Sequence, residues 1–130
     1  MNKIALIALM MFATAAEACQ PTVGAHIGTY HADRDAHYDE INPGAYVMCD
    51  GYTAGVYHNS EGGTSAYAGY TAKVGPVDVT IGVVSGYQRG LMPMLVPSVR
   101  LPVAGMRLAF LPPIPGAKGN TAGIHLMKDF

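Results

Sequence analysis

Residues 77–87 read VDVTIGVVSGY, and this stretch decides the fold. Large aliphatic side chains occupy every second position, and the positions between them are mostly small or polar: Val77, Val79, Ile81 and Val83 alternate with Asp78, Thr80, Gly82 and Val84. A period of two is that of a β-strand, whose successive side chains point to opposite faces. The stretch therefore predicts a strand with one large aliphatic face and one small, partly polar face.

The same division recurs along the chain. In residues 65–73, Tyr67, Gly69 and Thr71 share one face, and in residues 105–111, Met106, Leu108 and Phe110 lie opposite Arg107 and Ala109. No stretch of ten residues has a helical period of 3.6. Glycine and proline occur at short intervals, and SEGGT at 60–64 and GPVD at 75–78 are typical of hairpin turns. The pattern predicts eight strands, at about 23–31, 45–50, 52–59, 65–74, 77–87, 94–101, 104–111 and 121–129.

Short connections between neighbouring strands favour an all-β antiparallel meander. One apolar face and one small or polar face favour a small barrel or a strongly curved sheet of about eight strands. The large residues then face either lipid or a packed interior. The chain ends AGIHLMKDF, with Ala122, Ile124, Leu126 and the terminal Phe130 on one face. This ending is typical of proteins assembled into the bacterial outer membrane, although Lys128 departs from the pattern.

Two features favour a barrel on the periplasmic side instead. A strand that crosses a bilayer needs about 9–11 residues, and several of the expected strands are shorter. Pro93, Pro97 and Pro102 each remove a backbone donor, which predicts an edge, a bulge or irregular structure in this region. Residues 111–120, LPPIPGAKGN, are typical of a loop.

The first residues, 1–18, are typical of a cleaved signal peptide. Lys3 precedes an apolar run, and Ala16-Glu17-Ala18 is an A-x-A cleavage pattern. Residues 19–130 then form a single domain that is exported to the periplasm or the outer membrane. An exported chain meets an oxidising compartment, so Cys19 and Cys49 are candidates for a disulfide. Acylation of Cys19 and two separate cysteines are the alternatives.

The charge of the chain excludes one class of partner. The net charge is −1 and no basic patch is present, so nucleic acid is not an expected partner. Membrane lipid is the partner that the barrel pattern suggests, and no protein partner or cofactor is indicated.

Residues 29–46, TYHADRDAHYDEINPGAY, concentrate the titratable groups of the chain: His31, Asp33, Asp35, His37, Asp39 and Glu40. We interpret this acidic segment as a solvated loop at the mouth of the barrel, with Asn42-Pro43-Gly44 as its turn. A second hypothesis is a binding or acid–base site that combines His31 with Asp39, Glu40 or Asn42. A third is a metal site, but a calcium loop would need glycine where Tyr38 stands and glutamate where Gly44 stands.

One pattern extends over most of the chain and is carried by His31, Asn42-Pro43-Gly44, Gly51-Tyr52, Tyr57-His58-Asn59-Ser60, Ser65 to Gly69, Gly82 to Tyr87 and Met92-Pro93 to Pro97. In these residues the chain resembles a poorly characterised family of short exported proteins of phages and Gram-negative bacteria. Some members of that family are described as sn-glycerol-3-phosphate transporters. The resemblance implies an exported all-β protein and transfers no catalytic residue.

His58, Ser60 and Glu61 form a His-x-Ser pair followed by a glutamate. In these residues the chain has a second, weaker resemblance to small outer-membrane barrels of the lipid A deacylase type, which use such a pair with a nearby glutamate. Residues two apart on a strand share a face, which suits a hydroxyl activated by an imidazole. The same residues also read as an ordinary turn.

Three functions stay open at this point. The first is a non-enzymatic protein of the cell envelope, encoded by a phage or prophage and acting at the host surface. The second is a lipid-modifying acyl hydrolase with a His/Ser or His/carboxylate pair. The third is a small-solute transport component, which is the least favoured because side chains fill a barrel of about eight strands.

Overall fold

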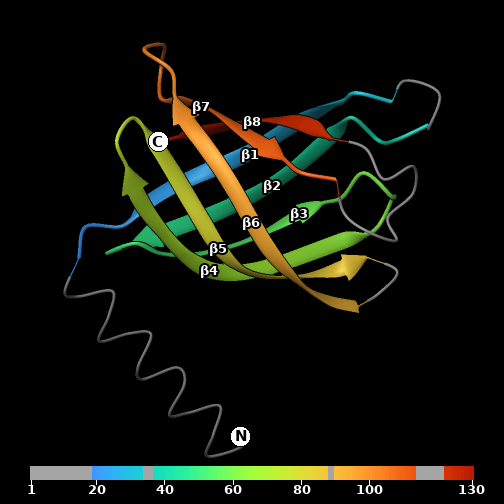
Figure 1. The fold of residues 1–130 in the computed structure, drawn as a ribbon, viewed down its shortest axis with the longest axis horizontal. Coiled ribbons are helices and arrows are strands. Elements are labelled where there is room, and N and C mark those ends of the chain that lie inside the picture. The colour runs from blue at the N-terminus through green and yellow to red at the C-terminus, as the bar shows by residue number, and fades with distance from the viewer. Residues whose placement is uncertain (1–18, 34–36, 88–89, 114–121) are drawn as a thin grey trace, which may run out of the picture.

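The computed structural model describes residues 19–33, 37–87, 90–113 and 122–130. The expected signal peptide and part of the acidic segment lie outside these residues. The chain forms a closed barrel in which each strand is hydrogen-bonded to the next (Figure 1). The strands are β1 Thr22–His31, β2 Ile41–Cys49, β3 Tyr52–His58, β4 Thr64–Val74, β5 Val77–Tyr87, β6 Gly90–Arg100, β7 Met106–Leu111 and β8 Gly123–Asp129. All pairs are antiparallel, including β8 with β1. The prediction of an all-β antiparallel barrel is confirmed.

The two ends of the barrel differ. The tight turns Asp50-Gly51 and Gly75-Pro76 and the connection 101–105 lie at the end where the chain enters β1 and leaves β8. We call this the terminal end. β1, β3, β5 and β7 end at the opposite end, the loop end. Among the described residues of the acidic segment, Asp33, Asp39 and Glu40 lie between β1 and β2 at this end.

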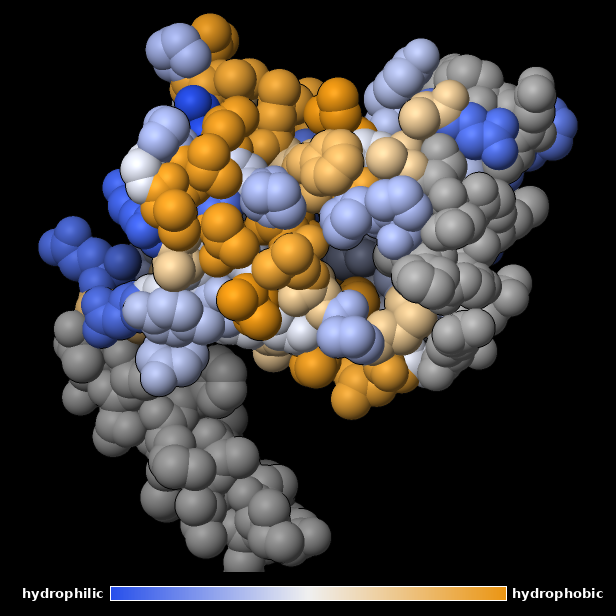
Figure 2. Space-filling model, in the orientation of Figure 1, coloured by the Kyte–Doolittle hydropathy of each residue, from blue (hydrophilic) through white to orange (hydrophobic). Residues whose placement is uncertain are grey.

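The barrel has a polar interior and an apolar exterior. Among the described residues, four apolar side chains are buried against eleven polar or charged ones. The large aliphatic residues of β5, such as Ile81 and Val83, are exposed on the outer face, whereas Asp78 is buried inside. Figure 2 shows apolar residues over much of the visible outer surface. The sequence left open whether the large residues face outward, and the structure shows that they do.

Asn42-Pro43-Gly44 is not a turn, which corrects one expectation. These residues belong to β2, which begins at Ile41. The pairing with β1 passes from His26↔Gly44 to Gly28↔Ile41, so β2 carries one extra residue there. A β-bulge of this kind accommodates a proline that cannot donate to the ladder. Asn42-Pro43-Gly44, a sequence typical of turns, therefore lies at a bulge within β2.

A second irregularity lies in β1. Its pairing with β8 passes from His26↔Met127 to Gly28↔Leu126, which leaves Ile27 unmatched. Because side chains alternate between faces, one extra residue reverses the alternation. His26 before the bulge and Thr29 after it are therefore both buried in the lumen, while Ile27 is exposed.

The disulfide joins Cys19 to Cys49, with the two Cα atoms 5.8 Å apart. It ties the start of the described chain to the end of β2. The oxidised pair agrees with the expected disulfide and is consistent with a protein outside the cytoplasm.

Candidate functional site

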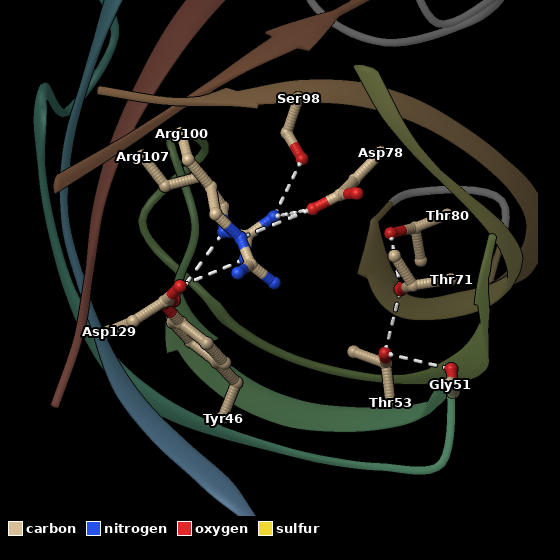
Figure 3. A network of polar contacts seen from close by, with 10 residues as sticks. All are labelled: Tyr46, Gly51, Thr53, Thr71, Asp78, Thr80, Ser98, Arg100, Arg107 and Asp129. Carbon is tan, nitrogen blue, oxygen red and sulfur yellow. Dashed lines mark hydrogen bonds and ion pairs between the residues drawn. The ribbon is translucent and has the colours of Figure 1, made fainter. Parts of the chain in front are cut away.

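The lumen near the terminal end is crossed by a charged network (Figure 3). Arg107 on β7 donates through Nη1 to Asp78 Oδ2 at 2.7 Å and to Ser98 Oγ at 3.2 Å. Its Nη2 donates to Asp129 Oδ2 at 2.9 Å, and the Tyr46 hydroxyl donates to Asp129 Oδ1. The network joins β2, β5, β6, β7 and β8 across the barrel, so it occupies the space through which a solute would pass.

A chain of hydroxyl groups lies beside this network. Thr53, Thr71 and Thr80 come from β3, β4 and β5, and successive Oγ1 atoms are 2.8 Å apart. Thr53 also donates to the carbonyl oxygen of Gly51 at 3.4 Å. A hydroxyl is both a donor and an acceptor, so such a chain satisfies polar groups on an inner wall without a charge.

Two histidines form the centre of the lumen. His26 Nδ1 lies 2.9 Å from His125 Nε2, and His26 Nε2 lies 3.0 Å from the Tyr67 hydroxyl. His125 Nδ1 lies 2.7 Å from Thr29 Oγ1. When both rings are neutral, each ring has one nitrogen that donates and one that accepts. Every nitrogen then has a partner if the donors point along the chain from Tyr67 to Thr29, or if they all point the other way. The bulge at Ile27 makes this chain possible, because it places both His26 and Thr29 in reach of one ring.

Tyrosine and asparagine side chains complete the polar lumen toward the loop end. The hydroxyls of Tyr57 and Tyr87 are 2.8 Å apart. Asn59 is fully buried and donates to Ser65 Oγ at 3.0 Å and to the carbonyl oxygen of Gly86 at 2.9 Å. Its own side-chain oxygen accepts from the backbone N–H groups of Glu61 and Gly63. Asn59 therefore fastens the turn after β3 to the barrel wall.

The structure brings together some of the residues expected to form a site. His58 Nε2 lies 3.0 Å from Asp39 Oδ2 at the rim of the barrel. Asn42 is buried and donates through Nδ2 to the carbonyl oxygens of Asp39, at 3.2 Å, and His58, at 3.0 Å. The His31 ring stacks on that of Tyr38, with centroids 4.2 Å apart. Asp39, Asn42 and His58 thus form one cluster, in which a carboxylate orients an imidazole.

The remaining expected residues lie nearby in different environments. Ser60 lines a cavity inside the barrel, and no hydrogen bond in the described part of the chain joins it to His58. Both carboxylate oxygens of Glu61 are buried and have no hydrogen-bond partner among the described residues. Burial raises the pKa of the Tyr38 phenol, and the negative charges of Asp33 and Glu61 add to this effect. The backbone carbonyl of Glu40 accepts from Thr29 N–H at 2.8 Å.

A cavity of about 90 Å³ lies inside the barrel. Polar residues of the lumen form one wall, including His26, His125, Tyr57 and Tyr67. Apolar side chains also line the cavity, mainly from β6, β7 and β8, with Met94, Val96, Ala109, Leu111 and Met127. The cavity is therefore lined by both polar and apolar side chains.

The described residues include one cluster with the spacing of metal ligands, formed by Cys19, Cys49 and Asp50. Its two cysteines are joined in the disulfide. Metal binding by cysteine uses the thiolate, which a disulfide sulfur is not. This cluster therefore does not supply a metal site.

Comparisons with known proteins do not identify a class for this barrel, so its class follows from its own geometry. The chain matches no protein-family model, and no curated protein matches it significantly. No helix among the described residues is both long enough and apolar enough to cross a bilayer. What the fold and the lumen define is a small closed antiparallel β-barrel with an apolar outer wall and a charged, hydrogen-bonded interior.

The central residues of the lumen were not among the candidates from the sequence. His26 and His125 are 99 positions apart, and Arg107 is 29 from Asp78 and 22 from Asp129. No local spacing links them. One signal was available: each of these residues occupies a small or polar position within an alternating strand, and in a barrel all such positions converge on one lumen.

Proposed function

We propose that this protein is a non-enzymatic barrel embedded in the outer membrane, with a closed lumen. The observation that carries the proposal is the inverted distribution of polarity. In a water-soluble barrel of this size the interior holds the apolar side chains, whereas here they cover the outside and charged groups pair within. Lipid is the surrounding that favours such an arrangement.

The lengths of the strands support a span across a bilayer. β1 and β2 have 10 and 9 residues, and β4, β5 and β6 have 11 each. Tilted strands of about 9–11 residues cross the hydrocarbon core. β3, β7 and β8 are shorter, at 7, 6 and 7 residues. Most of the wall therefore has the required height.

Aromatic residues mark two levels on the outer face. Toward the loop end, Tyr30 and Phe110 are exposed, and both pair with Ile124. Toward the terminal end, Tyr52 and Tyr70 are exposed and their rings meet edge to face with centroids 5.4 Å apart. Aromatic girdles at the two interfaces are typical of outer-membrane barrels.

The lumen supports a closed barrel rather than a transport path. Arg107, Asp78 and Asp129 cross the interior, and the described cavity is about 90 Å³. Removing one partner would leave buried charge unpaired, so the network resists opening. The resemblance to exported proteins of phages and Gram-negative bacteria supports a role at the surface of the host envelope.

The acyl-hydrolase alternative has one supporting contact, the His58–Asp39 pair. A hydrolase also needs a nucleophile within reach of the imidazole. Ser60 lines the inner cavity instead and has no hydrogen bond to His58. We therefore prefer the non-enzymatic function.

The test uses the full chain expressed in a Gram-negative host. We expect it in the outer-membrane fraction, resistant to extraction with alkaline carbonate, and with different gel migration before and after boiling in detergent. Release by osmotic shock with no heat-dependent shift would overturn the membrane position. In planar bilayers we expect no conductance from the unaltered protein. A conductance that appears when Arg107 is replaced would further support the closed lumen.

A further inference from the structure

The pairing between β6 and β7 is short. Only Ser98, Val99 and Arg100 of β6 pair with residues 107–109 of β7. On its other side, β6 pairs with β5 without a break from Met92 to Val99. In the described part of the chain, residues 90–97 of β6 therefore have no partner on the β7 side.

The two prolines of β6 face this unpaired edge. The β5–β6 ladder continues through Pro93↔Val83 and Pro97↔Val79. Proline has no N–H, so at these positions the bonds to β5 must come from the neighbouring residues, and each proline nitrogen points away from β5. The two prolines therefore remove two backbone N–H groups that would otherwise lie unpaired along this edge of β6. An edge with fewer unpaired donors costs less to expose to hydrocarbon.

Two hollows meet at the point where the pairing ends. Outside the barrel, a groove of about 290 Å³ is lined by Val77, Pro97, Val99, Leu108, Phe110 and Ile124. Ser98 and Ala109, which pair with each other, line both this groove and the inner cavity. Figure 2 shows the surface hollowed beside β6, near the end of β7 in the orientation of Figure 1. The outer groove and the inner cavity therefore lie on the two sides of the barrel wall at this pair, next to the point where the β6–β7 pairing ends.

The lining of the outer groove is suited to hydrocarbon. No charged side chain lines the outer groove. Inside the barrel, the apolar side chains of Met94, Val96, Leu111 and Met127 line the cavity together with polar residues of the lumen. Methionine side chains are flexible and adapt to the shape of an apolar occupant. A polar solute would find no hydrogen-bond partner along the groove apart from Ser98.

We propose that the β6–β7 junction binds one acyl chain of a membrane lipid. The acyl chain of the lipid lies in the outer groove, and the terminal carbons of this acyl chain pass beside Ala109 into the inner cavity. A cavity of about 150 Å³ holds a benzene-sized molecule, so the inner space of about 90 Å³ admits only the end of a chain. The headgroup remains outside the barrel. This inference rests on the proposed position in the membrane.

The experiment places the protein in phosphatidylcholine nanodiscs and labels its methionine methyl groups with carbon-13. A second lipid carries a nitroxide near the end of one acyl chain, and the loss of each methyl signal is compared before and after the nitroxide is reduced. Met94 and Met127 report on the cavity. Met106 precedes the buried Arg107 on β7 and so faces outward, where it reports on contact with lipid.

We expect the nitroxide to broaden the signals of Met94 and Met127 as well as that of Met106. Ala109→Leu fills the junction, since Ala109 is only 2% exposed, and should remove the broadening at Met94 and Met127 alone. Ala68→Leu adds the same side chain to the exposed outer face of β4 and should change nothing. Val96→Phe provides a second obstruction if Ala109→Leu does not fold.

The outcomes separate the two proposals. Broadening of Met106 without Met94 or Met127 in the unaltered protein would overturn the acyl-chain site and leave the membrane position standing. Broadening of Met94 and Met127 that persists in both obstructing variants would also overturn it. No broadening at any of the three methionines would overturn the membrane position itself.

Discussion

Arg107 Nη1 lies 2.7 Å from Asp78 Oδ2 inside a barrel whose outer wall is apolar. The side chain of Arg107 is 3% exposed, whereas Arg100, whose Nε lies 3.5 Å from the same carboxylate oxygen, is 57% exposed. The two arginines therefore contact the same carboxylate, but Arg107 is buried in the lumen and Arg100 is exposed to solvent.

This contrast gives a matched pair of substitutions. Arg107→Met leaves Asp78 and Asp129 without their buried partner, and we expect the free energy of unfolding to fall by about 3–5 kcal/mol. Arg100→Met removes a solvent-screened contact and should cost less than about 1 kcal/mol. Urea unfolding in detergent micelles, followed by circular dichroism and the heat-dependent gel shift, measures both. Equal losses would contradict the structural role of the buried network.

The disulfide gives a second prediction. Cys19 and Cys49 are separated by 30 positions, and a cross-link over such a loop contributes about 3 kcal/mol, mainly by restricting the unfolded chain. We expect the protein isolated from cells to have no thiol that reacts with iodoacetamide before reduction. Cys19→Ser with Cys49→Ser should lose about this free energy and keep the same circular dichroism spectrum. A fully alkylated protein before reduction would contradict the disulfide.

The strand pattern could be predicted from the sequence because the lumen and the outer wall impose a period of two on every strand. The strands of residues 77–87 and 65–74 were placed within one residue of their observed ends. Two starts were missed. β2 begins four residues before the expected position and β6 four residues before its own, because Pro43 favours a turn and Pro93 favours irregular structure. Pro43 lies at a bulge, and the prolines of β6 face an unpaired edge.

The interior could not be predicted in the same way. The alternation shows that Arg107 and Asp78 lie on the small or polar face, but their contact depends on two registers, that of β5 with β6 and that of β6 with β7. The bulge at Ile27 has no sequence signal of its own, and it decides that Thr29 joins His26 in the lumen. By contrast, His58 at the end of β3 and Asp39 in the connection after β1 meet at one rim, and the sequence analysis proposes both as site residues.

A third prediction concerns the curvature of the β4–β5 hairpin. Gly69 and Gly82 pair with each other on the inner face. A Cβ at Gly82 would lie 2.6 Å from Gly69 Cα and would also collide with the Ala68 carbonyl oxygen, so the backbone itself would have to move. We expect Gly82→Ala to cost about 2–3 kcal/mol.

Gly75, in the turn of the same hairpin, is the control for Gly82. It has a φ of +62°, and an added Cβ there meets nothing within 4 Å. Gly75→Ala should therefore cost only the strain of the left-handed backbone, about 1 kcal/mol. The same urea titration compares the two variants. A larger loss for Gly75→Ala than for Gly82→Ala would show that backbone conformation, and not close approach of the strands, limits this hairpin.

The last prediction separates the non-enzymatic function from the acyl-hydrolase alternative. His58 and Asp39 have the orientation of a base and its carboxylate, with Nε2 and Oδ2 3.0 Å apart. Nε2 is occupied by this contact, while Ser60 lines the lumen. We therefore expect cells that express the protein to keep the mass spectrum of their lipid A unchanged.

His58→Ala and Ser60→Ala provide the comparison, since neither should alter lipid A, outer-membrane localisation or the heat-dependent gel shift. Asp39→Asn should likewise have no effect on lipid A. Loss of an acyl chain from lipid A in cells with the unaltered protein would contradict the prediction, provided that Ser60→Ala restores the original mass. That result would require Ser60 to leave the lumen and reach the His58 imidazole, since a serine becomes a nucleophile only when a base takes its proton. Crosslinking of cysteines placed at 58 and 60 in membranes would then detect this second arrangement of the turn directly.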